Sequence, residues 1–149
     1  ASDQAGPDRR QFVASQLLFW LLGATDGHAK NFSIHLMPAG RFYLTPFYDV
    51  VSLQPNVDMN QMRSKDFRLA MAVGNNRHYR VNELTPRHFY QTADKAGLSK
   101  SDMDEAFTWL QNSVPSALGY TIAAMPKGFP SRIAESIAGG VTKRLRLVT

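Results

Sequence analysis

The stretch that decides the fold is residues 24–49, ATDGHAKNFSIHLMPAGRFYLTPFYD. It begins as an acidic loop, continues into the alternating segment 31–37, turns at 38–40 and returns through 41–44. Alternation of apolar and polar side chains is typical of a half-buried strand, and Pro-Ala-Gly is turn chemistry. The stretch therefore predicts an antiparallel hairpin whose two ends lie side by side.

Three side chains with oxygen atoms flank this hairpin: Asp26, Asn31 and Asp49. We expect them to meet at one corner, where carboxylate and amide oxygens suit a hard divalent cation and a phosphate. Protein kinases use the Asp-x-x-x-x-Asn spacing of Asp26 and Asn31 in their catalytic loop. There the Asp accepts the proton of the substrate hydroxyl and the Asn holds a metal ion. Asp49 would supply the second metal ligand.

Each of these residues also has a purely structural interpretation. Asp26 and Asn31 are common turn residues, and Asp49 could cap a helix after Pro46. The spacing by itself is a weak signal. Its position between an apolar helix and a hairpin that ends in another acid favours a site over three unrelated caps.

Two cationic or titratable side chains, His28 and Lys30, lie in the same loop and could contact a phosphate. His35 falls inside the predicted strand, where a structural role is favoured. A metallohydrolase built from Asp26, His28, His35 and Asp49 is an alternative. It lacks the paired histidines on one element that zinc sites usually have, so we favour the phosphate site.

Around this stretch the chain is mainly helical in pattern. Residues 8–22 carry a wide apolar stripe and predict a buried helix that ends at Gly23, after a mobile lead-in at 1–7. Segment 50–80 has little periodicity, and only 67–73 suggests a short strand or buried turn. Helices are then predicted over 86–96, from 99 onward, from Pro115 to 125 and over 132–147, the last with a basic end of Lys143, Arg144 and Arg146.

The composition describes one soluble domain of 149 residues with 44% hydrophobic and 19% charged side chains. The absence of cysteine excludes disulfides and thiolate metal sites, which fits a cytoplasmic protein. No apolar run is long enough for a transmembrane helix, so we expect no membrane partner. A net charge of +5 favours acidic partners such as nucleotides or nucleic acid, although many domains of this charge bind neither.

Two motifs carry a family resemblance: LGATDGHAKNFS at 22–33 and LTPFYDVVS at 44–52. With further matches at 69–71 and 86–89, the chain resembles the C-terminal part of the HipA family, the serine/threonine protein kinase toxins of bacterial type II toxin–antitoxin modules. The resemblance implies an ATP- and Mg²⁺-dependent enzyme. It implies Asp26 as catalytic base, Asn31 and Asp49 as Mg²⁺ ligands, and His28 and Lys30 near the nucleotide phosphates.

The same resemblance implies partners. They are a HipB-like helix-turn-helix antitoxin, operator DNA bound through the antitoxin complex, and a protein substrate such as glutamyl-tRNA synthetase. By charge position alone, Arg87, Lys95 and Lys100 are the candidates to lie near DNA. The alternative to a kinase is a non-catalytic helical module that docks an antitoxin and operator DNA.

The fold expected from these observations is mainly α with a small β-hairpin, the C-terminal lobe of a HipA or protein-kinase-like fold. Its parts are the helix, catalytic loop and hairpin (8–49), an irregular segment (50–80) and a helical bundle (84–148). The chain lacks the N-terminal lobe that supplies the phosphate-covering loop in the family. We therefore expect the chain alone to transfer phosphate poorly and to expose an apolar patch around the hairpin.

Overall fold

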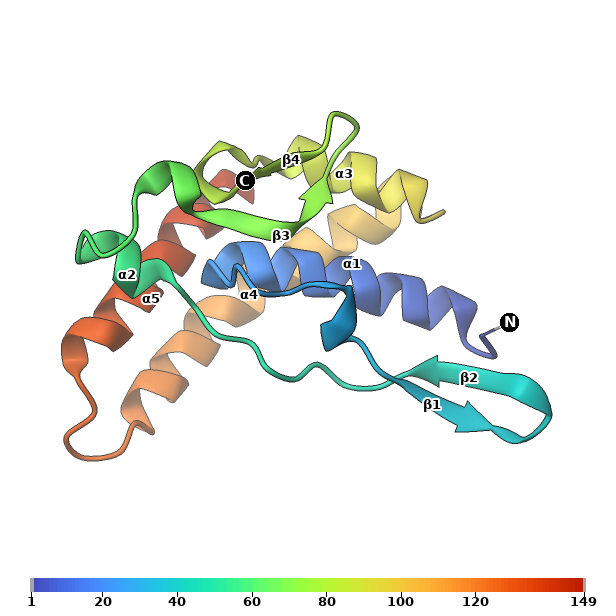
Figure 1. Cartoon of the computed structure of the whole chain (residues 1–149), viewed down its shortest axis with the longest axis horizontal. Helices are drawn as coiled ribbons and strands as arrows, with labels where there is room; N and C mark the ends of the chain where they lie inside the picture. The colour runs from blue at the N-terminus through green and yellow to red at the C-terminus, as the bar shows by residue number, and fades with distance from the viewer. Residues whose placement is uncertain (1, 149) are drawn as a thin grey trace.

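Helix α1 (Ala5–Leu22) runs through the middle of the computed structural model, which describes residues 2–148 (Figure 1). It begins three residues earlier than predicted, because the segment expected to be a mobile lead-in is partly ordered. Ser2 forms a bridge to Phe42, and the Asp3 amide donates to the Phe42 carbonyl at 3.0 Å. The predicted end at Gly23 is confirmed, and this residue has a left-handed conformation (φ 65°).

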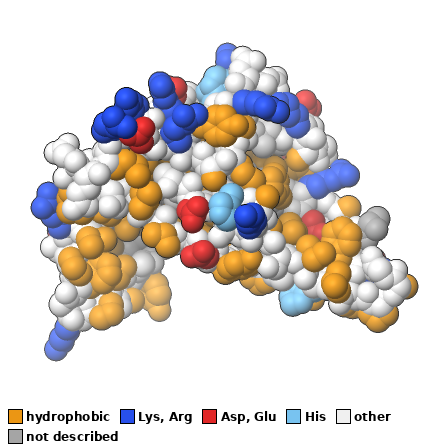
Figure 2. Space-filling view, viewed as in Figure 1, with side chains coloured by type: hydrophobic (Ala, Val, Ile, Leu, Met, Phe, Trp, Pro, Cys, Tyr) orange, Lys and Arg blue, Asp and Glu red, His pale blue; other side chains and the backbone are white. Residues whose placement is uncertain are grey.

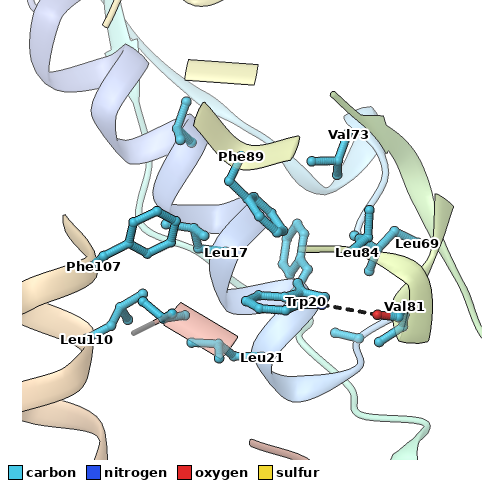
Figure 3. Close-up of a cluster of buried hydrophobic side chains, with 14 of the residues drawn as sticks. Leu17, Trp20, Leu21, Leu69, Val73, Val81, Leu84, Phe89, Phe107 and Leu110 are labelled. Atoms are coloured by element: carbon cyan, nitrogen blue, oxygen red, sulfur yellow. Dashed lines mark hydrogen bonds between the residues drawn. The ribbon is translucent and has the colours of Figure 1, made fainter. Parts of the chain in front are cut away.

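The apolar stripe of α1 forms the centre of the core, as predicted. Trp20 is fully buried, stacks at 5.0 Å on Phe89 and donates from Nε1 to the Val81 carbonyl at 3.1 Å (Figure 3). Leu17 and Leu21 lie on either side of it. The core is thus assembled from segments that lie more than sixty residues apart in the sequence.

The predicted hairpin is confirmed as β1 (Ile34–Met37) and β2 (Arg41–Leu44), paired antiparallel with Ile34 opposite Leu44. The expectation that its apolar side chains are half-buried is wrong for β1, where all four residues are exposed. The reason is tertiary: the hairpin extends away from the rest of the molecule, and no other described element covers β1 (Figure 1). Exposed apolar side chains are therefore present on the hairpin and after it: Ile34, Leu36 and Met37 on β1, and Tyr48 and Val51 in the segment that follows β2.

Segment 50–80 contains more regular structure than its sequence indicated. It holds a short helix, α2 (Gln54–Asp58), and a second antiparallel hairpin of β3 (Arg68–Val73) and β4 (His78–Arg80). The strand suggested at 67–73 is confirmed, and its partner β4 was missed. At three residues β4 is too short to show a period, and a register irregularity between Arg68 and Val73 blurs the pattern further.

Three helices complete the fold: α3 (Pro86–Lys95), α4 (Lys100–Ala123) and α5 (Ser131–Leu145). Both α3 and α4 start within a residue of their predicted positions, directly after Thr85 and Ser99. The prediction that Pro115 opens a separate helix is wrong, because α4 continues through it. A proline removes one helix hydrogen bond but does not force the helix to end, and Pro115 lies on an exposed part of α4.

Helix α5 contains one further departure from expectation. Arg144, assigned from sequence to a basic surface at the helix end, is only 4% exposed. Short 3₁₀ turns occupy Ala29–Asn31, Pro38–Gly40, Ser64–Asp66, Val81–Glu83 and Arg146–Val148. None of the helices formed within residues 2–148 is both long and apolar enough to cross a membrane. The prediction of a mainly helical fold with a small hairpin is confirmed.

Candidate functional site

The loop 24–31 is held against the end of α1 by backbone bonds and by one close packing contact. The Ala24 amide donates to the Phe19 carbonyl at 2.8 Å, which turns the chain back over the helix end. Gly27 lies directly on the Phe19 ring, where an added Cβ would come within 2.4 Å of ring atoms. Any larger residue at 27 would push the loop off the helix, so the glycine fixes the position of its neighbour Asp26.

The far end of the same loop is anchored by aromatic packing. Phe32 packs between two rings of α1, with centroid distances of 5.4 Å to Phe12 and 6.4 Å to Phe19. Aromatic contacts of this kind add to the free energy gained from burial alone. Because Phe32 follows Asn31 directly, its packing holds the backbone of Asn31 in place. The loop is thus fixed at both ends.

Asn31 and Asp49 are brought together as the hairpin predicted. Nδ2 of Asn31 donates to Oδ2 of Asp49 at 3.2 Å, and Oδ1 of Asn31 accepts from the His28 amide at 3.2 Å. Asp49 has a left-handed backbone conformation, with φ of 56°. Aspartate tolerates that region better than most residues, and here it turns the carboxylate toward the loop.

Asp26 lies at the exposed start of the same loop, where its contact is with His28 rather than with Asn31 or Asp49. Its side chain is 80% exposed, and Oδ1 lies 3.6 Å from Nε2 of His28. Figure 2 shows acidic, histidine and basic side chains side by side in the middle of this face, above a hollow between the hairpin and the α4–α5 end. Lys30 is exposed in the same loop. The exposure of Asp26 leaves room for a solute to approach its carboxylate.

The segment that carries Asp49 is tied to the loop and to α1. The Tyr48 hydroxyl lies 2.8 Å from the Ser33 hydroxyl, and the Leu53 amide donates to the Gly23 carbonyl at 3.0 Å. The Ser52 hydroxyl donates to the Leu22 carbonyl. Carbonyls at a helix C-terminus have no hydrogen-bond partner within the helix. These bonds therefore give carbonyls at the end of α1 a partner and also hold the Asp49 segment in place.

The donor set fits a magnesium ion rather than a transition metal. Within residues 2–148 no group of three or more His, Cys, Asp or Glu side chains is placed to hold a metal, and His35 stacks instead on Tyr43 at 4.8 Å. The metallohydrolase alternative therefore finds no support. Mg²⁺ takes few protein ligands, often one or two carboxylates, with water and phosphate oxygens completing its shell. The amide and carboxylate of Asn31 and Asp49 match that chemistry.

The three residues proposed from charge to lie near DNA are spread over α3 and α4. Lys95 donates to the Gly74 carbonyl at 3.0 Å, and Lys100 pairs with Asp104 at 2.9 Å. Arg87 is exposed. Both lysines thus contact groups of this chain, and their role toward DNA stays a prediction.

Several residues that support the site were missed from the sequence. The two segments of the site are held in place by Tyr48, Ser52, Gln54 and Arg144. No sequence pattern around these residues predicts that role. One signal was available: the Gly139-Gly140 pair, which weakens a helix unless another group must approach it closely.

Comparison with known proteins places this geometry in a family context. The family model described as the HipA-like C-terminal domain matches residues 1–118. The Shewanella oneidensis serine/threonine-protein kinase toxin HipA is 29% identical over 118 residues, which are 78% of this chain and 25% of that protein.

A solved structure shows the same similarity in three dimensions. It is the Shewanella oneidensis MR-1 toxin–antitoxin complex of HipA, HipB and operator DNA, matched with a TM-score of 0.71 at 25% identity. The match covers 94% of this chain and 30% of the solved chain. The chain thus spans between a quarter and a third of the length of these relatives.

Proposed function

The chain belongs to the HipA-like C-terminal domain family, and we propose that it carries the catalytic loop and metal ligands of a toxin–antitoxin serine/threonine protein kinase. The reaction is transfer of the γ-phosphate of ATP to a protein hydroxyl. The observation that supports this most strongly is the meeting of Asn31 and Asp49 at 3.2 Å beside the loop that carries Asp26.

In this proposal each site residue has a distinct role. Asp26 accepts the proton of the attacking hydroxyl, for which its exposure leaves room. Asn31 and Asp49 would hold Mg²⁺, which when bound neutralises charge on the phosphates. His28 lies next to Asp26 and orients the loop, while Lys30 offers a positive charge to the phosphates. The packing of Gly27 on Phe19 keeps Asp26 in place without a conformational search.

Phosphoryl transfer depends on positioning and on neutralising charge around the nucleotide. The chain matches only 25% of the length of the kinase relative, so the activity is proposed for the full natural protein that contains it. We propose that residues 1–149 act as the C-terminal kinase lobe and that a nucleotide-covering N-terminal lobe is its partner. The exposed apolar residues of the β1–β2 hairpin are available for such a contact.

The test is transfer of labelled phosphate from ATP by the full natural protein. Asp26→Asn should reduce incorporation at least about a hundredfold, because it removes the base but keeps the shape. Asp49→Ala should abolish Mg-ATP binding while the circular dichroism spectrum stays unchanged. Asp94→Asn, a change of an exposed acid on α3, is the matched control. Equal incorporation by wild type and Asp26→Asn would overturn the assignment.

A second candidate function rests on the solved relative, which is bound to HipB and operator DNA. In this proposal the chain docks a HipB-like antitoxin and lies near DNA without needing catalysis. Double replacement of Lys95 and Lys100 by Ala should then reduce the salt dependence of operator binding by the antitoxin complex. An unchanged slope removes these lysines from the interface. A protein substrate such as glutamyl-tRNA synthetase stays a prediction from the family resemblance.

A further inference from the structure

The C-terminal helix α5 places one buried cationic side chain, Arg144, between the end of α1 and the start of α2. Arg144 is 4% exposed, and its guanidinium makes three hydrogen bonds. Nε and Nη2 donate to the Leu21 carbonyl at 3.0 and 2.8 Å, and Nη1 donates to Oε1 of Gln54 at 2.8 Å. The planar guanidinium is therefore used as a fork with one arm on each of two segments.

These two segments are the ones that carry the site. Leu21 lies in the last turn of α1, five residues before Asp26. Gln54 opens α2, five residues after Asp49. One side chain thus joins the segment that leads into the loop to the segment that leaves the metal ligand.

The surroundings are shaped to admit this side chain. Gly140, one turn earlier on α5, is buried, and an added Cβ there would come within 2.6 Å of both Arg144 and Gln54. Gln54 also donates to Asp58 at 2.9 Å, and Asp58 accepts from Ser136 of α5 at 2.5 Å. Helix α5 therefore contacts α2 through two hydrogen bonds, Arg144 to Gln54 and Ser136 to Asp58, and the bond between Gln54 and Asp58 connects them.

A buried cation is an expensive way to stabilise a fold. Burial lowers the pKa of Arg144 to about 10, while Asp58 acts in the opposite direction, so the group stays charged at neutral pH. Well-packed apolar residues often stabilise a protein as well as a buried charged group does. What an apolar side chain cannot provide is a fixed hydrogen-bonded spacing between two backbone segments.

We propose that Arg144 is a positioning residue that sets the placement of the Asp26 loop relative to the Asp49 segment. Its catalytic consequence rests on the proposed kinase function, whereas its effect on the two segments does not. Arg144 lies outside the range 1–118 matched by the family model. The inference therefore assigns to α5 a part in the site that the family match does not contain.

The first test is amide hydrogen exchange on this chain, which reports local opening. In Arg144→Lys, one ammonium cannot span both acceptors, so exchange in 24–31 and 49–53 should rise on the order of tenfold relative to amides of α3. Gln54→Leu removes one arm and should raise exchange in 49–53 but not in 24–31. Lys143→Met, which removes an exposed cation from the same helix, should change neither.

The pattern decides between a positioning role and general stability. If exchange rises equally in α3, β3 and the two site segments, Arg144 only stabilises the fold and the proposal is wrong. It is also wrong if Gln54→Leu loosens both segments alike. Arg144→Met removes the charge as well as the hydrogen bonds and serves as a second variant. Its rise in amide exchange in 24–31 and 49–53 should be larger than that of Arg144→Lys.

The second test uses phosphate transfer by the full natural protein. Arg144→Lys should lower kcat about tenfold to a hundredfold with little change in the KM for the protein substrate, because geometry rather than binding is disturbed. An unchanged kcat in an active protein contradicts the proposal. If the wild type itself transfers no phosphate, the kinase function fails, and hydrogen exchange still decides the positioning role.

Discussion

The two antiparallel hairpins of this protein lie in opposite environments. In β1, Leu36 is 78% exposed and Ile34 is 46% exposed. In β3, Leu69 is 4% exposed and Val73 is completely buried. The first hairpin extends into solvent, whereas the second lies over α1 and beside α3 (Figure 1).

The difference shows that alternation in a strand specifies its two faces but not what covers them. β3 buries its apolar face because α1 and α3 supply a surface. The β1–β2 hairpin is fixed along its β2 side, where the Leu44 amide donates to Asp8 at 3.1 Å and Gln11 donates to the Thr45 carbonyl. The β3–β4 hairpin is thus part of the core. The β1–β2 hairpin lies outside the core and connects the segments that carry Asn31 and Asp49.

The largest expected effect compares matched leucines in the two hairpins. Leu69→Ala should lower the free energy of unfolding by about 2–4 kcal/mol, because it opens a cavity in the core. Leu36→Ala should change it by less than about 0.5 kcal/mol, because its side chain is already hydrated. Urea unfolding followed by circular dichroism measures both. Equal losses would show that β1 is covered in solution and would break the comparison.

A second matched pair lies in the turns. Gly74 (φ 79°) and Gly40 (φ 71°) both have left-handed backbones, but a Cβ on Gly74 would lie 3.0 Å from Gln91 and 3.2 Å from His88. Gly40 has open space around it. We expect Gly74→Ala to cost about 2–3 kcal/mol and Gly40→Ala about 1 kcal/mol, the backbone strain alone. Thermal unfolding should therefore separate them, and identical melting temperatures would contradict the packing argument.

The smallest expected effect is a pH dependence at His88 of α3, whose ring lies against His78 of the covered hairpin at a centroid distance of 4.0 Å. Burial, together with His78 and Arg87, lowers the pKa of His88 below 6.5. Because the unfolded chain then takes up a proton more readily, stability should fall as pH drops below about 6.5, by at most about 1.4 kcal/mol per pH unit.

Urea unfolding between pH 7 and 5 measures this slope. His88→Asn should remove most of it. If the slope persisted in His88→Asn, His88 would not be the titrating group.

Sequence reasoning recovered the elements whose signals are local. The helix at 8–22, the turn at 38–40 and the helix starts near 86 and 99 each depend on neighbouring residues, and each is confirmed. It failed where the decisive partner is distant. Strand β4 exists because β3 pairs with it, and Arg144 is buried because Leu21 and Gln54 accept its hydrogen bonds.

The sequence by itself pointed to the candidate site, because Asp26, Asn31 and Asp49 flank one short hairpin, and the pairing of its strands brings Asn31 to Asp49. Only the tertiary structure decided what holds that site. Gly27 packs on Phe19, and Arg144 joins Leu21 to Gln54, which lie 123 and 90 residues before it in the sequence. The physical reason is that chemical groups and turns are properties of nearby residues, whereas burial and hydrogen-bond partners depend on which surfaces the folded chain brings into contact.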